Sequence, residues 1–240
     1  MRSTRPILAA VAILAAAAPA LADVVVIRAS GPSAPRYAAG KSLPDGARIV
    51  LQRGDQIVLL DAHGTRTVSG PGTFPAVGSA TAAGSSLITL ASNTADRRNR
   101  VGAVRNLPTG TPAVRPNIFL VDVAAAGNVC VVDPRSVTLW RGAADAAGSS
   151  TIVGADGSTA TVAWIKGQTT QPWPTTLPVA ADRSYRVTQA GSAKAAPVPI
   201  AFQLMAAPPT DLPELAKGLI AHGCQAQVDV MIATTGAAAS

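Results

Sequence analysis

Two cysteines, Cys130 and Cys224, are the residues of this 240-residue chain whose chemistry is easiest to predict. In an oxidising compartment they would form a disulfide, and closing so long a loop stabilises a fold by roughly 4 to 5 kcal/mol in a chain-entropy estimate. The alternative is two buried free thiols, because residues 129–132 are an apolar, strand-like run. His222 lies near Cys224, but no second close pair completes a four-ligand metal site. We therefore expect a disulfide and no metal.

The next candidates are side chains that could make contacts. A predicted helix, capped by Ser85 and Ser86 and running to about Arg98, ends in a basic cluster. Such a cluster stabilises the negative end of a helix dipole, or it binds an anion or a partner. Its members are Arg97, Arg98, Arg100 and Arg105.

Trp173 is the tryptophan that stands out, because Pro172 and Pro174 hold it in an extended conformation that we expect to be exposed. It would stack on a sugar or a partner, or fold back to cover the edge of a sheet. Trp140 and Trp164 end apolar strands and are predicted to fill the core.

Groups for catalysis are scarce. His63 lies in a predicted turn and His222 near a predicted helix end, where a surface or dipole-pairing role explains each. The 13 acidic residues are scattered, mostly in turns, and the chain has no nucleophile elbow, phosphate loop or dinucleotide fingerprint. These features predict a protein that is not an enzyme and needs no cofactor.

The first 22 residues read as an export signal. Arg2 and Arg5 precede an apolar run over residues 7–18, and Ala20-Leu21-Ala22 provides a cleavage site. Removal would leave 218 of the 240 residues with a formal charge of +5 instead of +7. We expect a soluble periplasmic or secreted protein that does not bind nucleic acid. The basic surplus suits an anionic envelope component, although ordinary solubility also explains it.

Residues 23–75 are predicted to form an N-terminal β unit, with a first strand over residues 24–27. Two apolar runs, 49–51 and 57–60, flank a turn at 52–55 whose Gly54 allows positive φ, which predicts a hairpin. A β-branched strand over residues 65–68 should return after a turn at 61–64, before Gly70-Pro71-Gly72 interrupts the sheet.

The sequences DGARIVL, DQIVLLD and GTRTVSGPGTF within residues 44–74 resemble the repeating β core of FecR-type periplasmic domains. The resemblance covers about thirty residues and implies a sensing or regulatory β domain in the cell envelope. From this sequence we expect neither the transmembrane helix nor the cytoplasmic arm with which that family holds a sigma factor. The matching positions are Asp45, Gly46, Arg48, Arg66, Gly70 and Phe74.

A linker is predicted over residues 76–116, first because of its small residues and then because of three prolines between 107 and 116. Residues 117–206 contain seven strand-like runs separated by turn signals, which indicates an immunoglobulin-like or fibronectin-like β-sandwich. The expected strands span residues 118–123, 129–132, 137–140, 151–153, 159–164, 184–188 and 198–204.

Residues 207–235 are predicted to be a helical tail. Asp211 and Glu214 form a capping box, apolar residues follow at helical spacing, and Gly223 ends the helix. The run after it, around Val228 and Met231, fits a second helix or a strand equally well. Residues 236–240 should be frayed.

Two functional hypotheses follow from these features. One is a non-enzymatic sensing or scaffolding protein that contacts an envelope protein or an anionic envelope component. The other is a glycan-binding or glycan-processing module that uses Trp173 and the arginine cluster.

Overall fold

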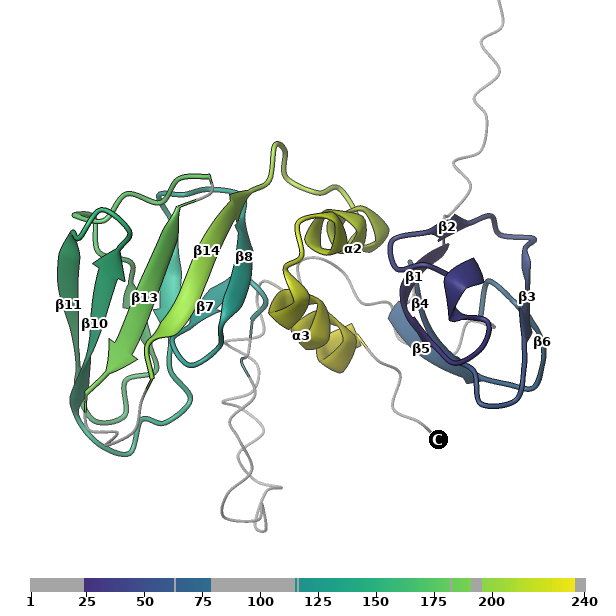
Figure 1. Ribbon diagram of the computed structural model, residues 1–240, viewed down its shortest axis with the longest axis horizontal. Coiled ribbons are helices and arrows are strands. Elements are labelled where there is room, and N and C mark those ends of the chain that lie inside the picture. The colour runs from purple at the N-terminus through teal and green to yellow at the C-terminus, as the bar shows by residue number, and fades with distance from the viewer. Residues whose placement is uncertain are drawn as a thin grey trace, which may run out of the picture.

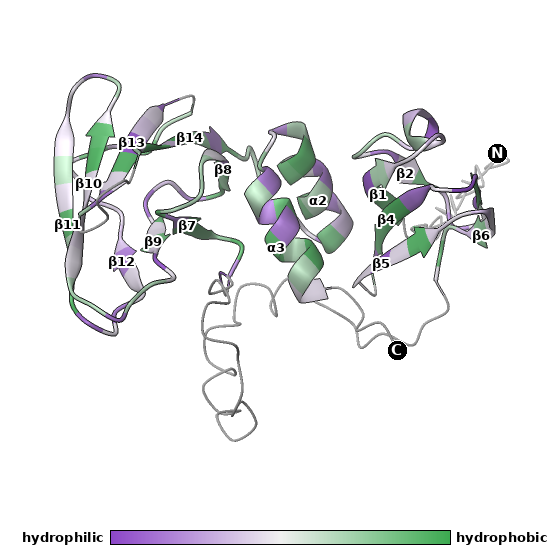
Figure 2. Cartoon of the chain, turned by 60° about the horizontal axis from the view of Figure 1, so that its bottom comes forward, coloured by the Kyte–Doolittle hydropathy of each residue, from purple (hydrophilic) through white to green (hydrophobic). Residues whose placement is uncertain are grey.

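The computed structural model describes residues 24–62, 64–78, 115, 117–181, 183–190 and 196–235, and this part of the chain is mainly β. A small N-terminal β unit lies at one end of the molecule and a larger β-sandwich at the other (Figure 1). Two C-terminal helices lie between them, as both views show (Figure 2). The predicted fold class is therefore confirmed. The predicted export signal, residues 236–240 and the helix expected at 85–98 lie outside the described residues.

The N-terminal unit contains two antiparallel sheets. Strands β2, β1, β4 and β5 form one sheet in that order, and β3 and β6 pair in the other. A short 3-10 turn, η1, follows β1. The elements are β1 (Val24–Ser30), η1 (Ala34–Arg36), β2 (Ser42–Leu43), β3 (Arg48–Leu51), β4 (Gln56–Asp61), β5 (Gly64–Ser69) and β6 (Gly72–Pro75).

The predicted hairpin between residues 57–60 and 65–68 is present as β4 and β5, but the one between 49–51 and 57–60 is wrong. β3 pairs with β6 instead of β4, with Ile49 opposite Phe74. The turn at 52–55 carries the chain from one sheet to the other. Ile49 and Leu51 of β3 then pack against Ile57 and Leu59 of β4 across a shared core. Because the two sheets face each other, the apolar side chains of both runs are buried between them.

β1 and β4 are buried on both faces. Val24 and Val26 face the core between the two N-terminal sheets, whereas Val25 and Ile27 face the C-terminal helices. In β4, Leu59 and Leu60 divide in the same way. A strand with both faces covered needs a continuous apolar run instead of alternation. This explains the uninterrupted VVVI and IVLL sequences.

The second unit is a two-sheet β-sandwich. A five-stranded sheet has the order β11-β10-β13-β14-β8, and a three-stranded sheet has the order β12-β9-β7. The pairs β8–β14 and β7–β9 are parallel, and the others are antiparallel. The strands are β7 (Leu120–Asp122), β8 (Gly127–Val131), β9 (Thr138–Trp140), β10 (Gly148–Gly154), β11 (Thr159–Trp164), β12 (Thr170–Pro172), β13 (Ser184–Gln189) and β14 (Val198–Leu204).

All seven predicted strands of the sandwich are present, and β12 was not predicted. Trp140 and Trp164 are 5% and 2% exposed, which confirms their predicted core role. The Trp164 indole nitrogen donates a hydrogen bond to Ser150 Oγ at 2.9 Å, so its polar group is satisfied inside the core.

The tail forms two helices, α2 (Leu212–Ala221) and α3 (Gln225–Thr235). The predicted cap of α2 is confirmed, because the Asp211 side chain accepts a hydrogen bond from the Glu214 backbone N–H at 2.7 Å. The Glu214 carboxylate reaches back to the Thr210 backbone N–H, one residue before the cap. Gly223 ends the helix at φ +68°. The run around Val228 and Met231, whose sequence fits a helix or a strand equally well, is helical.

Candidate functional site

The disulfide joins the helical tail to the sandwich. Cys130 of β8 is bonded to Cys224, which directly precedes α3, and both cysteines are buried. Beside the disulfide, the Gln227 side chain accepts a hydrogen bond from the Cys130 backbone N–H at 2.6 Å and donates one to the Cys130 carbonyl at 2.9 Å. It therefore bonds to β8 as a neighbouring strand would.

The other side of the helical pair contacts the N-terminal unit. Arg28 of β1 forms an ion pair with Asp229 of α3 at 2.5 Å, and Thr65 of β5 donates a hydrogen bond to the Ile232 carbonyl at 3.3 Å. Leu215 and Leu219 of α2 lie in one apolar cluster with side chains from both β units. The two helices thus hold the β units together by contacting both of them. We call this set of contacts the bracket.

Buried Arg115 adds to this bracket. Its guanidinium donates to the Leu120 carbonyl at 3.0 Å and to the Ala226 carbonyl at 2.7 Å. Burial lowers its pKa, while the charges of Asp122 and Asp229 act in the opposite direction. The roles of Arg115 and Gln227 could not be predicted from the sequence. A single polar residue, beside a proline-rich segment or in a run that fits helix and strand equally well, does not indicate its bonding partners.

Trp173 is not exposed as expected. It is 7% exposed, and its indole nitrogen donates to the Leu177 carbonyl at 2.7 Å. Its ring forms T-shaped contacts with the rings of Tyr185 and Phe202, with centroids 5.0 and 4.9 Å away. The flanking prolines direct the ring into the core instead of towards solvent. The alternative prediction, a covering role, therefore describes Trp173, although its ring also lines a hollow of about 370 Å³ beside Arg135.

The four clustered arginines of the sequence analysis, at positions 97, 98, 100 and 105, lie outside the described residues.

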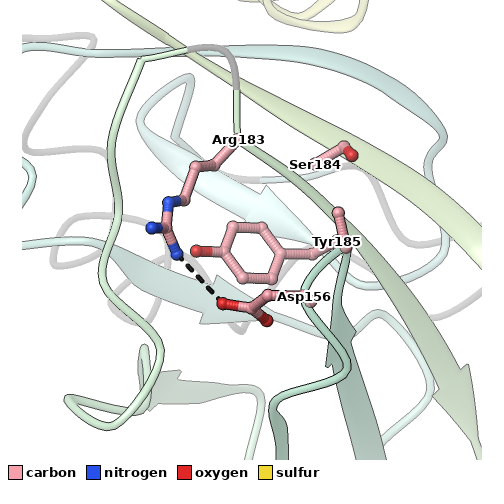
Figure 3. Close-up of a pocket in the computed structure, with 6 residues that line it drawn as sticks. Asp156, Arg183, Ser184 and Tyr185 are labelled. Carbon is pink, nitrogen blue, oxygen red and sulfur yellow. Dashed lines mark hydrogen bonds and ion pairs between the residues drawn. The ribbon is translucent and has the colours of Figure 1, made fainter.

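A hollow of about 170 Å³ lies beside the turn between β10 and β11 (Figure 3). Arg183 and Asp156 form an ion pair across it at 3.3 Å, and the Tyr185 ring lies beside them. The Tyr185 hydroxyl donates to the Pro178 carbonyl, and burial raises its pKa. The other Asp156 oxygen accepts hydrogen bonds from Ser158, which lower the pKa of Asp156. The Asp156 carboxylate and its partners Arg183 and Ser158 thus stabilise the turn between β10 and β11.

Other carboxylates have similar structural roles. Burial opposes ionisation of Asp55, but hydrogen bonds from Ser33 and Gln52 outweigh it and lower the pKa of this group. Bonds from the Arg135 backbone and the Ser136 hydroxyl lower the pKa of Asp133. Each carboxylate stabilises a turn in its ionised form.

The exposed charges of the N-terminal unit are of one sign. We call Arg36, Lys41, Arg48 and Arg53 the N-terminal cations; all four are exposed, and within the described residues none forms an ion pair. Among the acids of this unit, Asp55 and Asp61 are buried and Asp45 is half-buried.

Several hydrogen bonds connect the segments that carry these cations. Asp55 ties the loop before η1 to the turn that carries Arg53, through Ser33 N–H at 2.9 Å and Gln52 N–H at 2.5 Å. Lys41 Nζ donates to the Arg36 carbonyl at 2.8 Å. Tyr37, beside Arg36, bonds to the backbone of β3, the strand that carries Arg48. A basic surface around η1 and β3 results.

Over the part of the chain that the structure describes, no cluster of three or more His, Cys, Asp or Glu residues is arranged to hold a metal ion. In the same residues, neither helix is long and apolar enough to span a bilayer. Searches found no protein-family model, curated protein or solved structure that matches this chain.

Proposed function

We propose that this chain is an exported, non-enzymatic scaffolding protein of the cell envelope, and that its N-terminal β unit contacts an anionic envelope component. The observation that carries the proposal is the exposed set of N-terminal cations without ion-pair partners among the described residues. Unpaired surface cations attract anionic groups at short range and steer their approach.

The charge distribution along the chain supports this contact. Residues 24–114 contain ten Lys and Arg but four Asp, whereas residues 115–240 contain eight charges of each sign. The whole basic surplus of the chain after the predicted signal therefore lies in the N-terminal half. A charge added only for solubility would not need to concentrate in one half.

The bracket supports a scaffolding role. The disulfide, the Gln227 amide and the Arg28–Asp229 ion pair connect the sandwich, the helices and the N-terminal unit in series. A contact made by the basic unit would then fix the position of the sandwich. The FecR-like sequence is consistent with an envelope location. The glycan alternative loses its main support because Trp173 is buried.

Vesicle binding tests the proposal. Residues 23–240 should sediment with vesicles containing phosphatidylglycerol and not with pure phosphatidylcholine vesicles, and 0.5 M salt should release them. A soluble acidic polysaccharide provides a second arm, which distinguishes a glycan source of anionic groups from a lipid source.

A pair of charge-matched variants localises the contact. The triple variant Arg36→Gln/Arg48→Gln/Arg53→Gln should weaken binding by about tenfold or more, since each cation near an anionic surface contributes about 1 kcal/mol. The control triple Arg135→Gln/Lys166→Gln/Arg186→Gln removes three exposed charges from the sandwich and should change binding less than threefold. Equal losses in the two triples, or no binding to either anionic probe, would refute the proposal.

A further inference from the structure

We propose a second binding site, for a small organic carboxylate, at the end of the sandwich where β10 begins and β11 and β13 end. Its anion-binding group is Arg141, which directly follows β9. This site is independent of the basic surface on the N-terminal unit, and it lies in the other β unit.

The Arg141 guanidinium is held in one orientation. Its Nε donates to the Gln168 carbonyl at 2.9 Å and its Nη2 to the Ile165 carbonyl at 2.8 Å. The guanidinium carbon lies 5.1 Å from the centre of the Trp164 ring, a cation–π contact. Only 7% of the residue is exposed. Such a group is preorganised, so little entropy is lost when it binds a ligand.

The charge of Arg141 has no counter-ion within the described residues, where the two ion pairs are Arg28–Asp229 and Arg183–Asp156. Its two bonded partners are neutral carbonyls. The guanidinium borders a hollow, and a charge without a counter-ion attracts an anion there. A bound anion would provide that partner.

The Arg141 guanidinium has further N–H donors with which it could bind an anion. A guanidinium has five N–H groups, of which two are used here. The edge formed by Nη1 and the second Nη2 hydrogen has the geometry that binds a carboxylate through two parallel hydrogen bonds. Nη1 lies beside Gly148, because a β-carbon on that glycine would be 3.8 Å from it.

A hollow of about 350 Å³ adjoins Arg141. This volume is at the lower end of the range for small-molecule sites. Small side chains form much of its wall, and Gln189 adds an amide. The lining includes Ala143, Asp145, Ala147, Gly148, Trp164 and Gln189.

Asp145 selects among anions. It is exposed and lines the same hollow, beyond ion-pair distance of Arg141. Its negative charge opposes phosphate and other multiply charged anions more strongly than a single carboxylate. Together with the small apolar wall, it favours a monocarboxylate about the size of an N-acylated amino acid.

The probe is N-acetylalanine, with its neutral amide, N-acetylalaninamide, as the matched control ligand. Ligand-observed NMR titration of residues 23–240 should show that the acid binds at least tenfold more tightly than the amide. Inorganic phosphate should bind more weakly than the acid. Equal binding of acid and amide, or equal or tighter binding of phosphate, would overturn the proposal.

Three variants test whether N-acetylalanine binds at this site. Arg141→Lys keeps the charge but loses the guanidinium edge that makes two parallel hydrogen bonds, so it should weaken binding of the acid at least tenfold. Asp145→Asn removes the repulsion at an exposed position and should tighten binding two- to fivefold, which decides the proposal even if Arg141→Lys does not fold. Lys166→Gln removes an exposed cation from the neighbouring turn and should change binding less than twofold. Loss of binding in Lys166→Gln equal to that in Arg141→Lys, or no change in Asp145→Asn, contradicts the assignment.

Discussion

Buried polar side chains take the place of missing strand neighbours at two sheet edges. The Tyr37 hydroxyl accepts from the Val50 N–H at 2.9 Å and donates to the Val50 carbonyl at 3.2 Å, which satisfies the outer edge of β3. Gln227 does the same for Cys130 in β8, and it also donates to the Ile118 carbonyl at 3.0 Å. An open edge would leave these groups unpaired or exposed to another chain.

Gln227→Leu tests this role at the residue scale. The substitution preserves much of the volume but leaves the Cys130 N–H and two carbonyls without partners in a buried site. Because each unsatisfied buried group costs about 1 to 3 kcal/mol, we expect the free energy of unfolding to fall by roughly 3 kcal/mol or more. Urea unfolding followed by tryptophan fluorescence measures it. Gln225→Leu, at an exposed position of the same helix, should change stability by less than about 1 kcal/mol. Similar losses in the two variants would contradict the role of Gln227.

The hydrogen bonds of Asp55 predict how the stability of the fold depends on pH. Its pKa in the folded state lies below the ordinary value of 3.8, because hydrogen bonds to the carboxylate outweigh its burial. The folded state therefore favours the ionised form, and this stabilisation is complete above the unfolded pKa and is lost as pH falls through the folded pKa. We expect the wild type to lose more stability between pH 5 and pH 3, two test values on either side of about 4, than Asp55→Asn does. Hydrogen exchange in β1 and β4 measures the difference; the same pH slope in both proteins would exclude this contribution.

At the scale of elements, strands marked by β-branched runs and turn residues could be predicted from the sequence. β4, β5, β10, β11 and the cap of α2 lie where those signals put them. Their pairing was less predictable. Gly54 indicates a turn, and its φ is +85°, but a turn does not show whether the next strand joins the same sheet or the facing one. That choice depends on Phe74, twenty residues after Gly54, which lies in β6 opposite Ile49.

α3 could not be predicted for a related reason. Its buried residues include two polar ones, Gln227 and Thr235, together with Val228 and Met231. A helix packed between two β units has no single apolar stripe, so the periodicity of its sequence is weak. The candidate site residues show the same limit: Arg141 depends on carbonyls of the loop at 165–168, which a lone arginine in the sequence does not reveal.

The disulfide gives the prediction at this scale. It joins β8 to the start of α3 across a separation of 94 residues. Cys130→Ala/Cys224→Ala should lower the free energy of unfolding by about 4 kcal/mol, mainly because the unfolded chain regains entropy. Urea unfolding of the variant and of the reduced wild type should give midpoints that agree with each other and lie well below that of the oxidised protein. A variant within about 1 kcal/mol of the oxidised protein would show that the non-covalent bracket is sufficient without the disulfide.

At the scale of the whole molecule, three apolar clusters are arranged in series. One lies within the N-terminal unit, one within the sandwich, and a third is shared by α2, α3, β1, β4 and β8. In the sequence, this third cluster is indicated by the uninterrupted apolar runs of β1 and β4, which supply side chains to both faces of the sheet. The strand-like runs and the proline-rich linker indicated two β units but not the element that joins them.

Leu219→Ala tests whether the shared cluster makes the molecule one cooperative unit. Leu219 is fully buried there, so we expect a loss of about 2 to 5 kcal/mol. The described tryptophans, Trp140, Trp164 and Trp173, all lie in the sandwich, so their fluorescence reports that unit, and hydrogen exchange in β1 and β4 reports the other.

The expected result is that Leu219→Ala shifts both signals to the same lower urea midpoint. Leu51→Ala is the comparison, because Leu51 lies in the cluster of the N-terminal unit alone. If the helices couple the units, Leu51→Ala should also lower the fluorescence midpoint, although the substitution is in the other β unit. Two separated midpoints in Leu51→Ala, with the fluorescence midpoint unchanged, would show that the bracket joins two units that unfold independently.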